Sequence, residues 1–404
     1  MASTVAAAPD GSAGVKELEH QLYMRTFARQ PITLVRGEGV RVWDDQGKSY
    51  LDFLAGLAVN ILGHCHPVLV KAVQEQVATL IHTTNLYYTG PQMELAKLLV
   101  AHSALDRVFF TNSGAEANEC AIKLARKWGK QHRNGAFEVI STLNSFHGRT
   151  LATLAATGNR HYQEAFDPMP AGFKHVPFND LDAMRAAVTD DTAAILLEPV
   201  QGESGVHLAT RDYLRGVRAL CDEKNVLLIL DEVQSGMGRT GTLWAYEQYG
   251  IEPDVMTVAK GLAGGLPIGA CLAKEAAAVF TPGDHGSTFA GGPLVSAAGR
   301  AVLQEVLDKD LAGNARRMSG RLVKGLEELK AEADSKITEL RTAGLWIGIE
   351  FGEEKATAIL DRCRDNGLLV NKTSNTAIRI APPLIVTAAD CDEFLDIFGR
   401  AVTA

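Results

Sequence analysis

This chain of 404 residues has few of the features that accompany disulfide frameworks, metal centres or membrane spans. Its six cysteines are scattered and form no Cys-x-x-Cys pair, so neither a disulfide framework nor a metal site is predicted. No dense basic block occurs and the net charge is −8, which argues against a nucleic-acid partner. No stretch approaches the ~20 consecutive apolar residues of a membrane span. An acidic globular protein without a membrane partner is therefore expected.

The first 14 residues also lack the basic segment and the long apolar run of a secretion signal. Their richness in Ala, Ser and Gly predicts a frayed end, and a cytoplasmic location follows by elimination. Apolar residues make up 46% of the chain and charged residues 22%, as in ordinary globular proteins. The length predicts two domains, or one large domain with an appendage.

Short apolar runs alternate with helical patterns through the middle of the chain. Such alternation predicts an α/β fold whose sheet is largely parallel and covered by helices on both faces. The predicted strands are 107–111, 137–142, 193–198, 226–231, 254–258 and 268–272. The predicted helices are 67–80, 93–102, 115–130, 211–224 and 293–307.

The two ends of the chain have different patterns. Apolar and polar residues alternate around a turn in 35–53, which predicts a hairpin. Beyond residue 308, a smaller α+β domain is predicted from a charged helix (314–333), a strand (345–351), a helix (355–366) and a second strand (377–380). We therefore expect three parts: an N-terminal segment that joins the small domain (1–66), a large domain (67–307) and a C-terminal small domain (308–404).

The most informative residues are an acid and a lysine that end two apolar strands. Asp231 ends the run 226–230, and Lys260 follows the strand 255–258 beside a glycine. A lysine amine can form a Schiff base with an aldehyde, and a shielded carboxylate can keep a pyridine nitrogen protonated. The pair therefore predicts pyridoxal 5′-phosphate chemistry, with a helix-capping aspartate and a surface lysine as the alternative interpretation. After Asp231, Val233 is placed to press on a ring face and Gln234 to hydrogen-bond a ring substituent.

Two loops carry small residues and hydroxyls suited to anions. Ser113 can cap the helix that follows it, and Gly114 allows an anion to approach the free amide groups of the first turn. The loop 286–292 carries Ser287 and Thr288 among glycines. A plain helix cap and a flexible turn remain open as alternatives.

Four further residues are candidates for cofactor or substrate contacts. Phe146 can stack on a planar ring, and Arg149 presents a fork matched to a carboxylate. Glu198 ends a strand, where ligand crevices of open α/β sheets lie. Arg379 is a charge within an apolar strand and needs an anion, either a structural acid or a substrate carboxylate. Ordinary packing and solvation are the alternatives for the first three residues.

One motif suggests a different class of enzyme. Residues 236–241 match the Gly-x-Gly-x-x-Gly pattern of dinucleotide-binding dehydrogenases. That pattern needs its first glycine in the tight turn directly after a strand, whereas four residues separate Asp231 from Gly236. The match is therefore interpreted as accidental.

In order and spacing, five segments resemble the class III pyridoxal phosphate-dependent aminotransferases. They are 112–119, 146–149, 230–234, 259–261 and 285–288, and the similarity extends from residue 30 to residue 383. The resemblance implies a fold-type I aminotransferase with a large, mostly parallel sheet domain and a smaller α+β domain. It also implies a homodimer with shared active sites.

The resemblance implies a role for each matching residue. Lys260 matches the Schiff-base lysine and proton carrier, and Asp231 the partner of the pyridine nitrogen; both are the expected catalytic residues. The expected cofactor-binding residues are Gly114, Ala115, Phe146, Asp231, Glu232, Val233, Gln234, Lys260 and Thr288, the last supplied by the neighbouring subunit. The expected substrate-binding residues are Arg149, Ser287, Glu198 and Arg379, with Glu198 as the switchable partner of Arg379.

The implied reaction moves the terminal amino group of N2-acetylornithine to 2-oxoglutarate, a step of arginine biosynthesis. Ornithine, succinylornithine and 4-aminobutyrate are alternative donors, and a non-catalytic binding protein on the same scaffold is the alternative class. The chain departs from the family at Gly292, where Asn is frequent, and at Phe27, where ornithine-preferring relatives have Tyr. The lost hydroxyl at Phe27 favours an acylated substrate.

Overall fold

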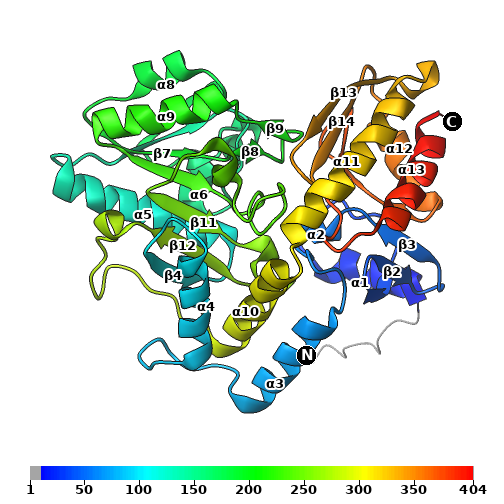
Figure 1. Ribbon diagram of the computed structural model, residues 1–404, viewed down its shortest axis with the longest axis horizontal. Coiled ribbons are helices and arrows are strands. Elements are labelled where there is room, and N and C mark those ends of the chain that lie inside the picture. The colour runs from blue at the N-terminus through cyan, green and yellow to red at the C-terminus, as the bar shows by residue number, and fades with distance from the viewer. Residues whose placement is uncertain (1–10, 404) are drawn as a thin grey trace.

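The computed structural model describes residues 11–403, and its centre is a seven-stranded sheet (Figure 1). In spatial order the strands are β4 (Arg107–Thr111), β12 (Gly269–Ala273), β11 (Val255–Val258), β10 (Leu227–Asp231), β7 (Thr192–Leu197), β5 (Glu138–Thr142) and β6 (Phe173–Val176). Five neighbouring strands pair in parallel: β6, β5, β7, β10 and β11. By contrast, β12 runs antiparallel to both β11 and β4. The predicted fold class is therefore confirmed, with one reversed strand inside the sheet.

Both faces of this sheet are buried. Successive side chains of a strand point to opposite sides, so both sets of side chains must be apolar. In β10, Leu227 and Ile229 join the core formed with helix α5 (Gly114–His132), whereas Leu228 and Leu230 join the larger core on the other face. Each such side chain contributes about 1.5–3 kcal/mol when fully buried. A wholly apolar run is therefore stable only as an interior strand.

Helices surround the sheet as its alternating pattern requires. They are α3 (Pro67–Thr79), α4 (Gly90–Ala101), α5, α6 (Leu151–Ala156), α7 (Arg160–Gln163), α8 (Leu181–Ala187), α9 (Arg211–Lys224) and α10 (Pro293–Asp308). α10 packs against α3 and α4, and α5 packs against β11 and β12. Pro stands in the first turn of α3, α4 and α10, where its missing N–H costs nothing.

The two ends of the chain form a second body beside the large sheet (Figure 1). One sheet contains β13 (Ile337–Thr342), β14 (Ile347–Phe351), β17 (Ala377–Ile380) and β16 (Asn371–Lys372). The other contains β1 (Leu34–Glu38), β2 (Arg41–Asp44), β3 (Ser49–Asp52) and β15 (Leu368–Leu369). The helices are α1 (Gly11–Leu22), α2 (Ala55–Ala58), α11 (Leu311–Lys330), α12 (Ala356–Asp365) and α13 (Ala388–Thr403). Since β15 pairs with β3, the N-terminal segment is hydrogen-bonded to the C-terminal part.

Several elements differ from the expectation. The predicted hairpin at 35–53 is a three-stranded unit, β1–β3. β6 was not predicted because Phe173–Val176 is a short edge strand with two polar residues. β13 was not predicted either, since charged residues interrupt its apolar alternation. The predicted domain boundaries at 66 and 307 stay a prediction. Between residues 11 and 403, no helix has the length and apolarity to cross a membrane.

Candidate active site

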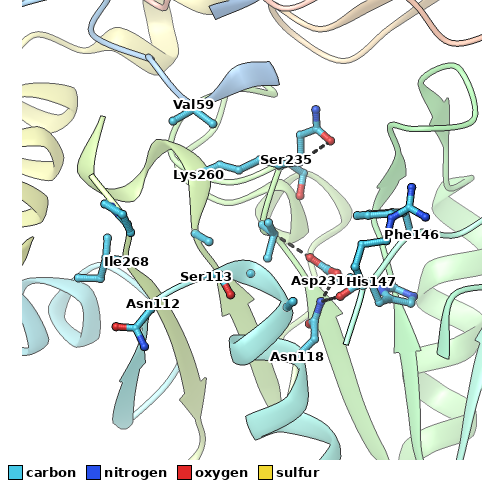
Figure 2. Close-up of a pocket in the computed structure, with 18 of the residues that line it drawn as sticks. Val59, Asn112, Ser113, Asn118, Phe146, His147, Asp231, Ser235, Lys260 and Ile268 are labelled. Atoms are coloured by element: carbon cyan, nitrogen blue, oxygen red, sulfur yellow. Dashed lines mark hydrogen bonds and ion pairs between the residues drawn. The ribbon is translucent and has the colours of Figure 1, made fainter. Parts of the chain in front are cut away.

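A pocket of about 410 Å³ opens where several central strands end (Figure 2). The loops after β4, β5, β7, β10 and β11 all contribute to its wall. This is the edge of an open α/β sheet at which ligands bind. The predicted residues that line the pocket are Gly114, Ala115, Phe146, Arg149, Glu198, Asp231, Val233, Gln234 and Lys260. The structure therefore brings together residues that lie far apart in the sequence.

Asp231 is held at the end of β10 by a network of buried polar groups. The amide Nδ2 of Asn118 donates to Asp231 Oδ2 at 2.7 Å, and His147 Nδ1 contacts the same oxygen at 2.8 Å. The N–H of Val233 donates to the other oxygen at 3.0 Å. Thr257 in turn donates to Asn118 at 2.7 Å, so β11 and α5 both orient this carboxylate. Only 5% of Asp231 is exposed, so solvent weakly screens its electrostatic interactions with groups in the pocket.

Lys260 approaches the same cavity from the other side, below Val59 in the view of Figure 2. Its Nζ donates to Gln234 Oε1 at 2.8 Å. Burial is the main cause that lowers the pKa of Lys260 from 10.5 to about 8. The residue has φ 42°, in the left-handed region that a lysine adopts only when surrounding structure imposes it. A partly neutral amine at a fixed position is suited to act as a nucleophile.

The first turn of α5 forms an anion cradle at the floor of the pocket. Ser113 caps the helix, accepting the N–H of Glu116 through its hydroxyl at 3.2 Å. The first amides of a helix have no intrahelical partner, and Gly114 and Ala115 supply two of them to the pocket wall. A Cβ at Gly114 would lie 2.7 Å from Val233 Cγ1, so only glycine fits there.

Glu198 is a second acid in the pocket wall. It is 7% exposed, and its Oε1 accepts the backbone N–H of Phe146 at 2.9 Å. Burial, followed by the repulsion of Asp231, raises the pKa of Glu198 well above its usual value. The surroundings of Glu198 therefore favour its protonated form.

Arg379 does not pair with Glu198 in this structure. Its Nη1 donates to Glu203 Oε1 at 3.1 Å and to the carbonyl of Gly202 at 2.9 Å, while Nη2 donates to Asn371 at 2.9 Å. Burial alone would raise the pKa of Glu203. The positive charges of Arg379 and then Lys260 outweigh burial and lower this pKa. The acid that neutralises Arg379 here is therefore Glu203, five residues after the one that the sequence suggested.

Phe146 and Arg149 lie at the mouth of the pocket with a residue that sequence reasoning missed. The Arg149 guanidinium lies 4.0 Å from the centre of the Tyr162 ring and 5.4 Å from that of Phe146. The two rings meet edge to face at 6.3 Å. A cation over an aromatic ring is held without an acid partner and stays able to bind an anion.

Four predicted residues lie outside the lining of the pocket: Arg379, described above, and Ser287, Thr288 and Glu232. Ser287 accepts a hydrogen bond from Asn112, a lining residue, at 3.0 Å, and Thr288 is exposed beside it. Glu232 requires a correction, because it points into the protein and accepts the N–H groups of Ala245 and Tyr246 at 2.9 and 2.8 Å. It directly follows Asp231 at the strand end, where successive side chains face opposite sides. Glu232 thus holds the 245–249 turn and lies outside the pocket lining.

The glycine motif at 236–241 is not a dinucleotide site. Residues 233–241 form consecutive turns, and the next helical element is a short 3₁₀ turn at Ala245–Tyr249. A dinucleotide fingerprint needs a helix that starts at the motif and points its N-terminus at the phosphates.

The pocket has the groups that pyridoxal phosphate requires. Lys260 and Asp231 lie on different sides of the cavity, and the amide cradle at Gly114 suits a phosphate. The Nε2 of Gln234 is buried without a hydrogen-bond partner among the described residues, as expected for a group that awaits a ring hydroxyl. Val233 and Phe146 are both in the wall that a ring would contact. These residues fit the cofactor.

Comparisons with known proteins agree with this geometry. The profile of the family described as aminotransferase class-III matches residues 23–402. The chain is 51% identical over 386 residues to the acetylornithine aminotransferase of Caldanaerobacter subterraneus subsp. tengcongensis, covering 95% of this chain and 98% of that protein.

Solved structures show the same fold. The acetylornithine aminotransferase from Elizabethkingia anophelis has a TM-score of 0.87 at 33% identity, over 98% of this chain and 99% of that one. The ornithine aminotransferase from Toxoplasma gondii, solved with partial occupancy of PLP at its active site, has a TM-score of 0.93 at 32% identity, over 97% and 94% of the chains. The profile and the identity both extend over nearly all of this chain, which therefore belongs to the class III pyridoxal phosphate-dependent aminotransferases.

Proposed function

We propose that this protein transfers the terminal amino group of N2-acetylornithine to 2-oxoglutarate, giving N-acetylglutamate 5-semialdehyde and glutamate in arginine biosynthesis. The observation that carries the substrate assignment is the 51% identity, over 98% of its length, with a relative named acetylornithine aminotransferase. Free ornithine is the second candidate, because structural neighbours at 31–32% identity are ornithine aminotransferases. The higher identity favours the acylated substrate.

Pyridoxal phosphate, when bound, supplies an aldehyde that takes up amino groups and a ring that accepts electrons from the substrate carbon. The protein's part is to position, charge and shield that ring. The Asp231 carboxylate, fixed by Asn118 and His147, is proposed to hold the ring nitrogen protonated. The cradle at Gly114 and Ala115 is proposed to bind the phosphate, and Val233 to cover one ring face.

Lys260 is proposed to carry the proton between the substrate carbon and the cofactor. Its Nζ, lowered in pKa to about 8, can both accept and return a proton near neutral pH. The hydrogen bond to Gln234 fixes the amine when it is not in use. Burial of the residue keeps water away from the reacting carbon.

Glu203 and Arg379 are proposed to let one site accept two different substrates. With the ion pair closed, as in this structure, Arg379 is neutralised and the site suits the amine donor. When 2-oxoglutarate or glutamate binds, its second carboxylate replaces Glu203 on the guanidinium, so the pair opens. Arg149, exposed on the ring of Tyr162, is proposed to bind the carboxylate common to both substrates.

A homodimer with shared active sites is part of the proposal. Thr288 is exposed and does not line the pocket of its own chain, so it is free to serve a second one. Large apolar side chains near this loop are also exposed: Leu86 by 84%, Tyr88 by 97% and Phe289 by 67%. Apolar surface of this kind favours burial against a second copy. A cytoplasmic location is proposed with it.

A donor panel measured by half-reaction spectroscopy tests the substrate proposal. Acetylornithine, succinylornithine, ornithine, lysine and 4-aminobutyrate are each added to the holoenzyme, and the loss of the cofactor's visible absorption is followed. Acetylornithine is expected to give the highest rate per concentration. A faster reaction with ornithine would contradict the assignment and also the interpretation of Phe27, which is 65% exposed and outside the pocket lining.

Lys260→Ala tests the proposed role of the lysine. The variant is expected to lose both the visible absorption of the tethered cofactor and turnover, because Lys260 is the only lysine among the described residues that line the pocket. Lys274→Ala is the matched control, since Lys274 pairs with Glu252 outside the pocket lining. A coloured, active Lys260→Ala protein would exclude the assigned role.

A further inference from the structure

Arg239 is a buried cation without a carboxylate partner. Only 1% of the residue is exposed, and none of the ion pairs among the described residues includes it. Burial lowers its pKa from 12.5 to about 9. Its Nε and Nη2 are buried and have no hydrogen-bond partner among residues 11–403. Such a group is costly to bury, so its position needs a functional explanation.

The bonds that Arg239 does make cross from the large sheet domain to the C-terminal part. Its Nη1 donates to the carbonyls of Leu345 at 2.8 Å and Pro382 at 2.6 Å. Its own carbonyl accepts the N–H of Leu345 at 3.1 Å. One residue of the loop after β10 therefore holds two separate segments of the C-terminal part, next to β14 and β17.

Both segments are connected to Arg379, one along the chain and one through packing. Pro382 lies three residues after Arg379 on the chain that leaves β17. Leu345 precedes Trp346, whose ring lies so close to Gly202 that a Cβ there would be 2.0 Å from Trp346 Cζ2. The carbonyl of Gly202 accepts a hydrogen bond from Arg379. Arg239 thus constrains Arg379 at its backbone and, through Trp346 and Gly202, at its guanidinium.

We propose that Arg239 is a positioning residue for the second carboxylate of the dicarboxylate substrate, acting through Arg379. This inference rests on the proposed role of Arg379 in binding glutamate and 2-oxoglutarate. A guanidinium serves this purpose because its planar fork can donate to two carbonyls in fixed directions. Its effect is confined to the half-reaction in which Glu203 leaves Arg379, since the amine donor needs no second carboxylate.

Arg239→Met and Arg239→Gln test the proposal in the holoenzyme. We expect the KM for 2-oxoglutarate and the inhibition constant of glutarate to rise about tenfold or more, because small displacements of a substrate-binding group have effects of this size. The rate of cofactor bleaching by acetylornithine should stay within about twofold, since uniform damage to the pocket would lower both halves. Arg239→Lys keeps the charge and a single donor nitrogen, so it should recover part of the glutarate affinity.

Arg316→Met is the matched control. Arg316 on α11 donates to the carbonyl of Gly241, two residues from Arg239, but touches neither Leu345 nor Pro382. It should alter thermal stability and leave glutarate affinity unchanged. The proposal would be overturned if Arg239→Met lost equal activity in both half-reactions or kept an unchanged inhibition constant for glutarate. It would also be overturned if Arg239→Met and Arg239→Gln both failed to fold. Absence of any reaction with acetylornithine in the unaltered enzyme would instead contradict the proposed function.

Discussion

At the scale of single residues, burial decides what each titratable group in the pocket can do. Glu198 is buried and Lys260 is partly buried, and burial moves their pKa values in opposite directions because it disfavours the charged form of each. Asp231 is 5% exposed and has three hydrogen-bond partners that fix its position. On the surface, the same residue types would not have pKa values shifted by burial.

The lowered pKa of Lys260 predicts a pH dependence of cofactor capture. Below about pH 8 the amine is protonated and cannot attack an aldehyde, whereas above it the amine is neutral. The rate at which the apoenzyme captures pyridoxal phosphate should therefore rise with pH to a plateau above about 8, and absorbance stopped-flow would measure it. Glu203→Gln should shift the midpoint downward, because the Glu203 carboxylate raises this pKa. A rate that still rises at pH 10 would contradict the assigned environment.

At the scale of elements, the site depends on how one helix begins against two strands. α5 places its first turn at the proposed phosphate cradle and its Asn118 against Asp231 of β10, while β11 supplies Thr257 to the same network. Because these elements pack through buried apolar side chains, the cradle and the acid keep a fixed separation. One helix thus positions both the anion end and the acid end of the site.

Gly114→Ala tests this element-level argument. The new Cβ would lie 2.7 Å from Val233 Cγ1, so either the backbone of the first turn or the Val233 side chain must move. We expect the dissociation constant for pyridoxal phosphate to rise about tenfold, corresponding to ~1.4 kcal/mol, as measured by fluorescence titration of the apoenzyme. Gly320→Ala is the control, since nothing lies within 4 Å of its Cβ in α11. It should leave cofactor binding unchanged and stabilise the helix by up to about 1 kcal/mol.

At the scale of the whole molecule, the pocket lies between bodies that come from separate parts of the chain. Asp231 ends β10 and Lys260 follows β11 in the large domain, whereas Arg379 belongs to β17 in the other body. If Arg379 binds the second carboxylate as proposed, substrate selection depends on how the two bodies sit together, and Arg239 lies at that junction.

Shared active sites predict complementation between two inactive variants. Lys260→Ala and Thr288→Ala homodimers should each have low activity if Thr288 serves the partner's pocket. A mixed dimer then contains one site with both defects and one intact site, so remixing should restore up to half of the activity, measured after co-refolding or co-expression. The absence of any recovery in mixed dimers isolated by two affinity tags would contradict sharing.

Most elements of the large domain were predictable from sequence because their signals are local. Wholly apolar runs such as 226–230 and amphipathic patterns such as α5 predict strands and helices without knowledge of their neighbours. The acid and the lysine were recognisable because each follows such a run. β6 and β13 lack a clear local signal, since sheet pairing stabilises them despite polar residues.

Side-chain direction was what the tertiary structure alone decided. Glu198 and Glu203 lie five residues apart in one loop, and only the packed chain shows that Glu203 reaches Arg379. Glu232 adjoins Asp231, yet it faces the opposite way. The sequence by itself determined which elements form and which chemical groups lie at their ends, because backbone hydrogen bonding and apolar periodicity are local. The tertiary structure determined which of those groups meet, because contacts between distant segments depend on how all the elements pack together.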